Sequence, residues 1–100
     1  MNTFLGNLDE NSGILELAEN LTVEQFKNLK IKTFKIPQDL KVDAKNLKNC
    51  DSSGISAILW LIKEAKNQQR QVALINLPFT ALRLIKLYGL ENLEPLKNKA

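Results

Sequence analysis

Short stretches of alternating or continuous apolar residues predict a small β-sheet. Residues 3–8 and 14–17 flank the turn-forming run Asn11-Ser12-Gly13 and so predict an N-terminal hairpin. Residues 40–44 alternate apolar and polar side chains, and residues 72–75, Val-Ala-Leu-Ile, are a compact apolar run typical of a buried strand. The stretch 30–36 is ambiguous because its apolar residues alternate only in part. We expect four to five strands in all.

Apolar residues at helical spacing predict three helices between and after these strands. The first begins near Leu21, where Thr22 and Gln25 have the spacing of a capping box. The second covers residues 53–66, and the third covers residues 79–87, after Pro78 and before a stop at Gly89. A further short helix over residues 91–97 would contain Pro95, which disfavours it.

The predicted order is therefore hairpin, helix, strand, helix, strand, helix. Strand–helix–strand units favour parallel pairing with right-handed crossovers. We therefore expect an α/β protein with a small mixed β-sheet of four to five strands and helices packed on it. A length of 100 residues favours one domain over residues 1–100.

Composition says more about the cellular compartment of the protein than about its function. The one cysteine, Cys50, excludes an internal disulfide and suits a reducing cytosol. The first residues resemble no secretory signal, and no apolar run is long enough to cross a bilayer. The net charge of +3 is spread over scattered lysines without interleaved aromatic residues. This pattern favours a solvated surface over nucleic-acid binding, so we expect no nucleic-acid partner.

The segment Asn49–Ile55, NCDSSGI, places a carboxylate and two hydroxyls before an apolar run. Asp51 or Ser52 can accept backbone N–H bonds at the helix start, and Gly54 allows another backbone to approach closely. This can be a capped helix and nothing more. A helix N-terminus also favours negative charge, so a phosphate on Ser52 is an alternative. Asp51 would repel that phosphate, which makes such a site switchable.

The helix that follows has one apolar arc and one polar arc. The apolar arc faces the predicted sheet and contains Ile55, Ile58, Leu59, Leu61, Ile62 and Ala65. The opposite arc contains Ser56, Trp60, Lys63, Glu64 and Asn67. Trp60 is unusual among these polar neighbours. It either lies along the surface, tucks under another element, or anchors a partner, a role in which tryptophan is over-represented.

No catalytic constellation accompanies the segment. The chain has no histidine that could act as a base for Ser52 or Cys50. It has no phosphate-cradling glycine loop and no cluster of metal ligands. Asp51 gives the neighbouring Cys50 no thiolate stabilisation, so a buried structural thiol is expected. We therefore expect no enzyme activity, no cofactor and no metal.

The element order and the Asp-Ser-Ser-Gly turn resemble the STAS domain, the fold of bacterial anti-sigma-factor antagonists. In that family the turn opens the helix that meets the partner, and a partner kinase phosphorylates its first hydroxyl residue, which by position is Ser52. The second half of the chain is more narrowly similar to the small STAS subunit (MlaB-like) of the Mla phospholipid-transport ABC complex. Asp51-Ser52 matches that subunit's Asp-Thr step, and residues 84–90, LIKLYGL, match its LAKLYNL-like segment. Residues 1–49 match only in their order of elements.

The resemblance implies a non-enzymatic accessory subunit that binds the cytoplasmic ATPase of a phospholipid-transport ABC transporter serving outer-membrane lipid asymmetry. ATP would be the ligand of that partner. The protein would be cytoplasmic and would reach the inner membrane only through the transporter. The expected contact residues are Asp51, Ser52, Ser53, Ser56, Trp60 and Lys63. The alternative is an anti-sigma-factor antagonist that binds an anti-sigma-factor kinase and is switched by phosphorylation of Ser52.

Overall fold

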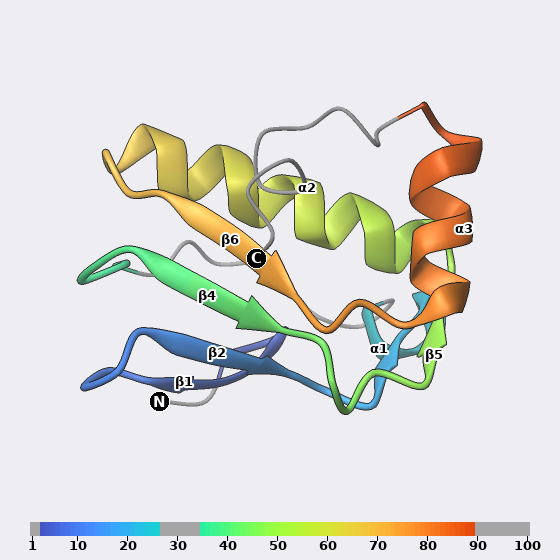
Figure 1. Ribbon diagram of the computed structural model, residues 1–100, viewed down its shortest axis with the longest axis horizontal. Coiled ribbons are helices and arrows are strands. Elements are labelled where there is room, and N and C mark those ends of the chain that lie inside the picture. Colours follow the sequence, from blue (N-terminus) through green and yellow to red (C-terminus); the bar gives the residue numbers. More distant parts are fainter. Residues whose placement is uncertain (1–2, 27–34, 90–100) are drawn as a thin grey trace.

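The four predicted strands form one mixed sheet. The computed structural model describes residues 3–26 and 35–89. In these residues the strands pair in the order β1-β2-β4-β6, as Figure 1 shows. They are β1 (Gly6–Asp9), β2 (Ile14–Leu17), β4 (Leu40–Asp43) and β6 (Val72–Ile75). The β1–β2 pair is antiparallel, and the β2–β4 and β4–β6 pairs are parallel. The predicted hairpin, the parallel pairing and the α/β class are confirmed.

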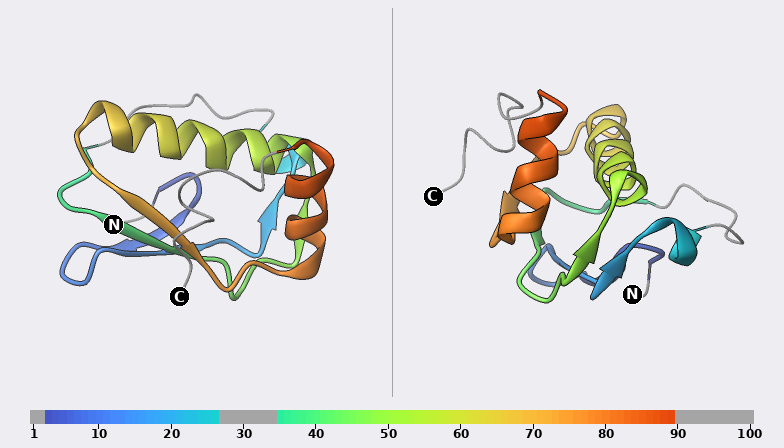
Figure 2. Two further views of the ribbon diagram at one scale, coloured as in Figure 1. Left: turned by 45° about the horizontal axis from the view of Figure 1, so that its top comes forward. Right: turned by 90° about the vertical axis from the view of Figure 1, so that its right-hand side faces the viewer.

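A second, two-stranded sheet was not predicted. It pairs β3 (Asn20–Leu21) in parallel with β5 (Asn49–Cys50). The side-chain amide of Asn49 also donates to the side-chain oxygen of Asn20 at 2.6 Å. Figure 2 shows the two strands side by side between two of the helices. This pairing brings the segment before Asp51 next to the segment that follows Leu21.

Three helices occur in the described part of the chain: α1 (Val23–Phe26), α2 (Ser52–Asn67) and α3 (Phe79–Leu87). Helix α2 lies along the four-stranded sheet, and α3 stands at the end where α2 begins (Figures 1 and 2). The predicted α2 bounds differ by one residue at each end, and those of α3 are confirmed. Gly89, with a φ of 70°, follows α3 as the expected stop. The expected helix over 91–97 and most of the ambiguous stretch 30–36 lie outside the described residues.

The core lies between the sheet and α2. Leu15, Val42 and Leu74 from the sheet are buried. The predicted apolar arc of α2 supplies Ile55, Ile58, Leu61 and Ala65 to the same core, while Leu59 and Ile62 are half-buried at its margin. Each fully buried leucine-sized side chain contributes roughly 1.5–3 kcal/mol. This burial fixes α2 on the sheet and therefore fixes which of its faces meets solvent.

The expected capping box at α1 is corrected by the structure. In residues 3–26 and 35–89, the side chains of Thr22 and Gln25 make no hydrogen bond to the backbone of the helix start. The Gln25 N–H donates to the Thr22 carbonyl at 2.9 Å instead. The first N–H of α1, from Val23, donates to the side chain of Asp51. Sequence spacing could not show this because the acceptor lies 28 residues away.

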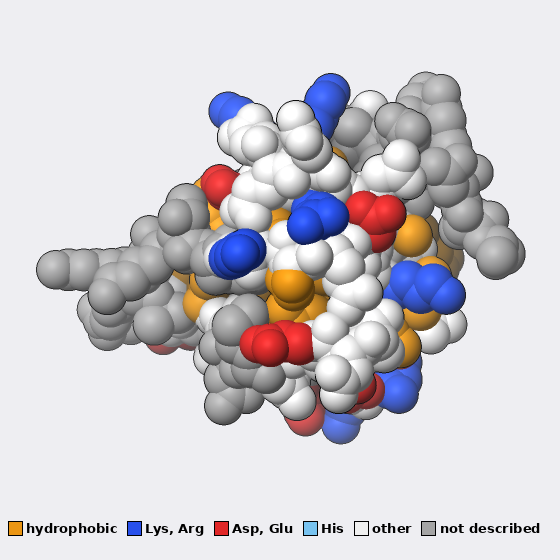
Figure 3. Space-filling model, turned by 90° about the vertical axis from the view of Figure 1, so that its left-hand side faces the viewer, with side chains coloured by type: hydrophobic (Ala, Val, Ile, Leu, Met, Phe, Trp, Pro, Cys, Tyr) orange, Lys and Arg blue, Asp and Glu red, His pale blue; other side chains and the backbone are white. Residues whose placement is uncertain are grey.

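The face farthest from α3 has a mixed charge. Figure 3 shows lysine and arginine side chains interspersed with aspartate and glutamate, with apolar side chains between them. No large patch of one sign forms on this face among the described residues. A surface of mixed sign is typical of solvated protein.

Candidate functional site

Asp51 is the N-cap of α2 and also holds α1. Its Oδ1 accepts the N–H groups of Ser53 at 2.9 Å and Gly54 at 3.2 Å. Its Oδ2 accepts the N–H of Val23 at 3.0 Å. The bond from Val23 is the main reason that the pKa of the Asp51 carboxyl is lowered, with the bonds from Gly54 and Ser53 adding to it. Of the two caps that the sequence allowed, the structure therefore has Asp51.

Gly54 lies where α2 meets β3. A Cβ at this position would lie 2.8 Å from Cys50 Sγ and 2.9 Å from Leu21 Cβ, and it would also strike the Leu21 carbonyl oxygen. Real Cβ atoms essentially never approach other atoms this closely. The expected role of Gly54, to let another backbone approach, is confirmed, and the approaching backbone is that of β3.

The start of α2 presents its hydroxyl and polar side chains to solvent. Ser52, Ser56 and Lys63 are exposed, and Ser53 is half-buried. Because Asp51 makes the cap, the Ser52 side chain is not needed for that purpose. At about 100° per residue, Ser52, Ser56, Trp60 and Lys63 share one side of the helix; we call these four residues the α2 ridge.

Trp60 is the member of the α2 ridge that is not fully exposed. The indole is half-buried and packs against the core. Its ring lies 5.3 Å from that of Phe4, edge to face, and Phe4 in turn contacts Phe26 at 6.1 Å. Of the alternatives that the sequence left open, the structure shows the indole tucked against Phe4, with the rest of its surface accessible. Helical spacing could not show this because Phe4 comes from a segment far away in the sequence.

Cys50 is half-buried rather than fully buried. Burial, together with the nearby Asp51 carboxylate, raises the pKa of the thiol to about 11. The thiol donates weakly to the Asp51 carbonyl at 3.6 Å. It is therefore protonated at neutral pH, which agrees with a structural role and disfavours nucleophilic chemistry.

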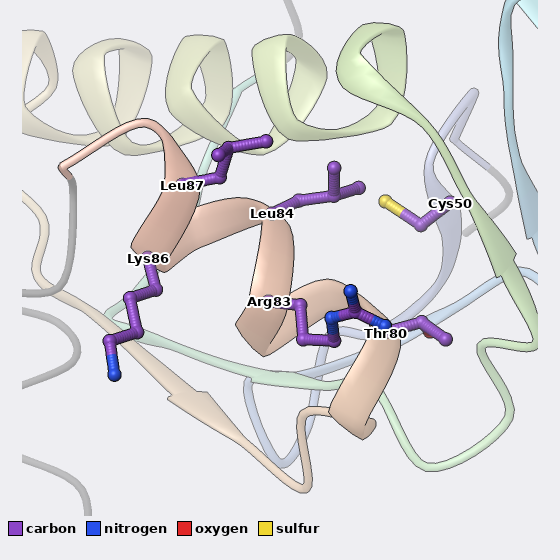
Figure 4. Close-up of a pocket in the computed structure, with 6 residues that line it drawn as sticks. All are labelled: Cys50, Thr80, Arg83, Leu84, Lys86 and Leu87. Atoms are coloured by element: carbon purple, nitrogen blue, oxygen red, sulfur yellow. The ribbon is translucent and has the colours of Figure 1, made fainter.

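A groove that was not predicted from the sequence lies between α3 and β5; we call it the α3 groove. It has a volume of about 490 Å³ and is lined by Cys50, Thr80, Arg83, Leu84, Lys86 and Leu87, drawn in Figure 4. A helical wheel of residues 79–87 would have shown apolar side chains on the solvent side. That signal was present in the sequence, whereas the neighbouring position of Cys50 depends on the unpredicted β5.

A second polar cluster lies at the ends of β4 and β6. Asp43 is buried and accepts from the Lys45 N–H at 2.9 Å and the Asn76 side-chain amide at 3.0 Å. Lys45 also forms ion pairs with Glu16 at 3.1 Å and with Asp43 at 3.9 Å. These partners satisfy the buried carboxylate, so the cluster is structural. Within residues 3–26 and 35–89, no group of three acidic, cysteine or histidine side chains is arranged to hold a metal ion.

The comparison with protein families agrees with this geometry. The family model described as "Mlab, STAS domain" matches residues 6–96, nearly the whole chain. The chain belongs to this MlaB-like STAS domain family. Its mixed sheet and the Asp51-capped helix α2 are consistent with a STAS-like fold. Comparisons with curated proteins and with solved structures give no significant match. No helix in the described residues of this STAS domain has the length and apolar character needed to span a membrane.

Proposed function

We propose that this STAS domain is a non-enzymatic accessory subunit that binds the cytoplasmic ATPase of an Mla-type phospholipid-transport ABC transporter. The observation that carries the proposal is the exposed Ser52 at the tip of α2, with the cap supplied by Asp51. The MlaB-like family supports a protein partner of the transporter type.

The α2 ridge, together with the capping pair Asp51 and Ser53, forms the proposed contact. Ser52 and Ser56 supply hydroxyls, Lys63 supplies a cation, and the accessible part of Trp60 supplies apolar area. The ridge is rigid because the opposite side of α2 is buried in the core. A preformed helix face loses little conformational entropy on docking, which favours affinity.

In this account the partner binds and hydrolyses ATP, and the STAS domain stabilises the ATPase in a competent arrangement. Residues 1–100 act as one domain in the cytoplasm. The domain reaches the inner membrane only through the transporter. The transporter serves the lipid asymmetry of the outer membrane, and the domain itself contributes no catalytic residue.

The test is the affinity of the purified protein for the ATPase subunit of an Mla-type transporter from the same genome, measured by titration calorimetry. Ser52→Glu adds a charge at the contact and is expected to weaken binding by about 2 kcal/mol, roughly 30-fold. Lys41→Glu, at an exposed position of β4, is the matched control and leaves the affinity unchanged. The proposal is wrong if wild type does not bind, or if Ser52→Glu binds as tightly as wild type.

The second candidate is an anti-sigma-factor antagonist, and the same exposed Ser52 favours it. The hydroxyl is accessible to a kinase, and the positive end of α2 would stabilise an added phosphate. This candidate predicts a phosphorylated species in the intact mass of protein isolated from cells. Protein without phosphate in every growth condition would exclude it.

A further inference from the structure

Several large apolar side chains are exposed on helix α3 and directly after it. Among the described residues, Phe79 is 73% exposed, Leu87 is 75% exposed and Tyr88, directly after the helix, is 49% exposed. Leu82 is also exposed. Isolated exposed apolar residues are ordinary, but a cluster on one short helix marks an interaction surface.

Two cations are interspersed with these apolar side chains. Arg83 lies over the ring of Phe79, at 5.9 Å from its centroid. Within residues 3–26 and 35–89, no carboxylate pairs with Arg83 or Lys86. Helix α3 contains no acidic residue. A partner that covers this face therefore has to offer apolar surface and negative charge together.

The α3 groove gives this surface a concave centre. In Figure 4, the Leu84 side chain points toward the Cys50 thiol, and Lys86 extends away from the other side chains. One residue separates Cys50 from Ser52, and α3 stands beside the start of α2 (Figure 1), so the groove and the tip of the α2 ridge lie at the same end of the molecule. One partner can therefore cover both.

We propose that the α3 groove receives an apolar side chain of the ATPase and that Arg83 binds a carboxylate next to it. This inference rests on the proposed function and names the chemistry of its partner. The apolar side chain packs on Leu84 and Leu87. Arginine suits the carboxylate because its guanidinium presents a planar set of donors that can bind both oxygens.

Two other occupants fit the surface less well. A symmetric contact with a second copy would bring α3 against α3, and Arg83 and Lys86 would face like charges without any acidic residue from that helix. A flat anionic bilayer would meet the projecting Phe79 and Leu87 but would leave the concave groove unfilled. An apolar segment of a folded protein with a nearby carboxylate satisfies both the groove and the cation.

The experiment measures the affinity of the ATPase for Arg83→Glu and Leu87→Ser. Both side chains are exposed, so both variants are expected to keep the wild-type circular dichroism spectrum. Each is expected to weaken binding at least tenfold, and Arg83→Lys to weaken it less than Arg83→Glu because the charge is kept. Lys66→Glu, at an exposed position near the far end of α2, is the control and binds as wild type does.

The outcomes separate this inference from the proposed function. If Ser52→Glu weakens binding while Arg83→Glu and Leu87→Ser bind within twofold of wild type, the α3 inference is overturned and the proposed function stands. If wild type does not bind the ATPase, both are overturned. Vesicles of phosphatidylglycerol serve as a second probe. If wild type binds them, Arg83→Glu does not, and the ATPase binds both proteins equally, the groove belongs to the membrane and the inference is wrong.

Discussion

At the scale of single residues, one carboxylate connects two helix starts. Asp51 accepts two N–H groups of α2 and one of α1, and these bonds exist in full only when the carboxyl is ionised. The pKa of this group is therefore lower in the folded chain than in the unfolded chain. Its stabilisation is complete above the unfolded value of 3.8 and is lost as the pH falls through the lower folded value.

Asp51→Asn tests this linkage. Asparagine can still cap α2 but carries no charge and offers only one carbonyl oxygen, so we expect a loss of about 1 kcal/mol at pH 7. We also expect the free energy of unfolding to fall less steeply than in wild type as the pH drops below about 4. Urea titrations from pH 7 to pH 2 measure both. Equal acid slopes for the two proteins would show that Asp51 does not carry the effect.

At the scale of elements, the contact between α2 and β3 depends on a missing side chain. Gly54→Ala would force a Cβ against Leu21 and Cys50, so β3 or the first turn of α2 has to move. We expect a loss of about 1–3 kcal/mol, the range for overpacked sites, although alanine has the better helix propensity. The midpoint of urea unfolding reports this loss. Ser56→Ala, at an exposed position of the same helix, is the control and stays within about 0.5 kcal/mol. A Gly54→Ala protein as stable as wild type would contradict the close approach.

Elements with a periodic pattern could be predicted from the sequence. The strands β2 and β6 and the helix α3 have the predicted bounds because their apolar residues, together with Pro78 and Gly89, mark them locally. The strands β3 and β5 have two residues each, which is too short for any periodicity. They form because the fold brings the two segments together and lets them pair, and this pairing leaves no local pattern in the sequence.

The local features of the candidate site could also be predicted from the sequence, whereas its contacts between distant segments could not. The cap at Asp51 and the close approach at Gly54 follow from residue type at the start of a helix. The hydrogen bond from Val23 to Asp51, the contact of Trp60 with Phe4, and the α3 groove all join segments far apart in the sequence. A single sequence holds no direct signal for such contacts.

At the scale of the whole molecule, the tip of α2 and the α3 groove lie at the same end. Figure 1 shows α3 standing beside the start of α2, with β5 leading into that start. The opposite end presents interspersed charges of both signs. The proposed docking uses one end of the molecule, so we expect binding of the ATPase to slow hydrogen exchange at that end alone.

Hydrogen–deuterium exchange of the protein, alone and in complex with the Mla-type ATPase, shows which end of the molecule the partner covers. We expect slower exchange in residues 52–56 and 79–87 on binding, with no change at the edge strand β1. Protection confined to residues 6–17, with unchanged exchange at the start of α2, would contradict it.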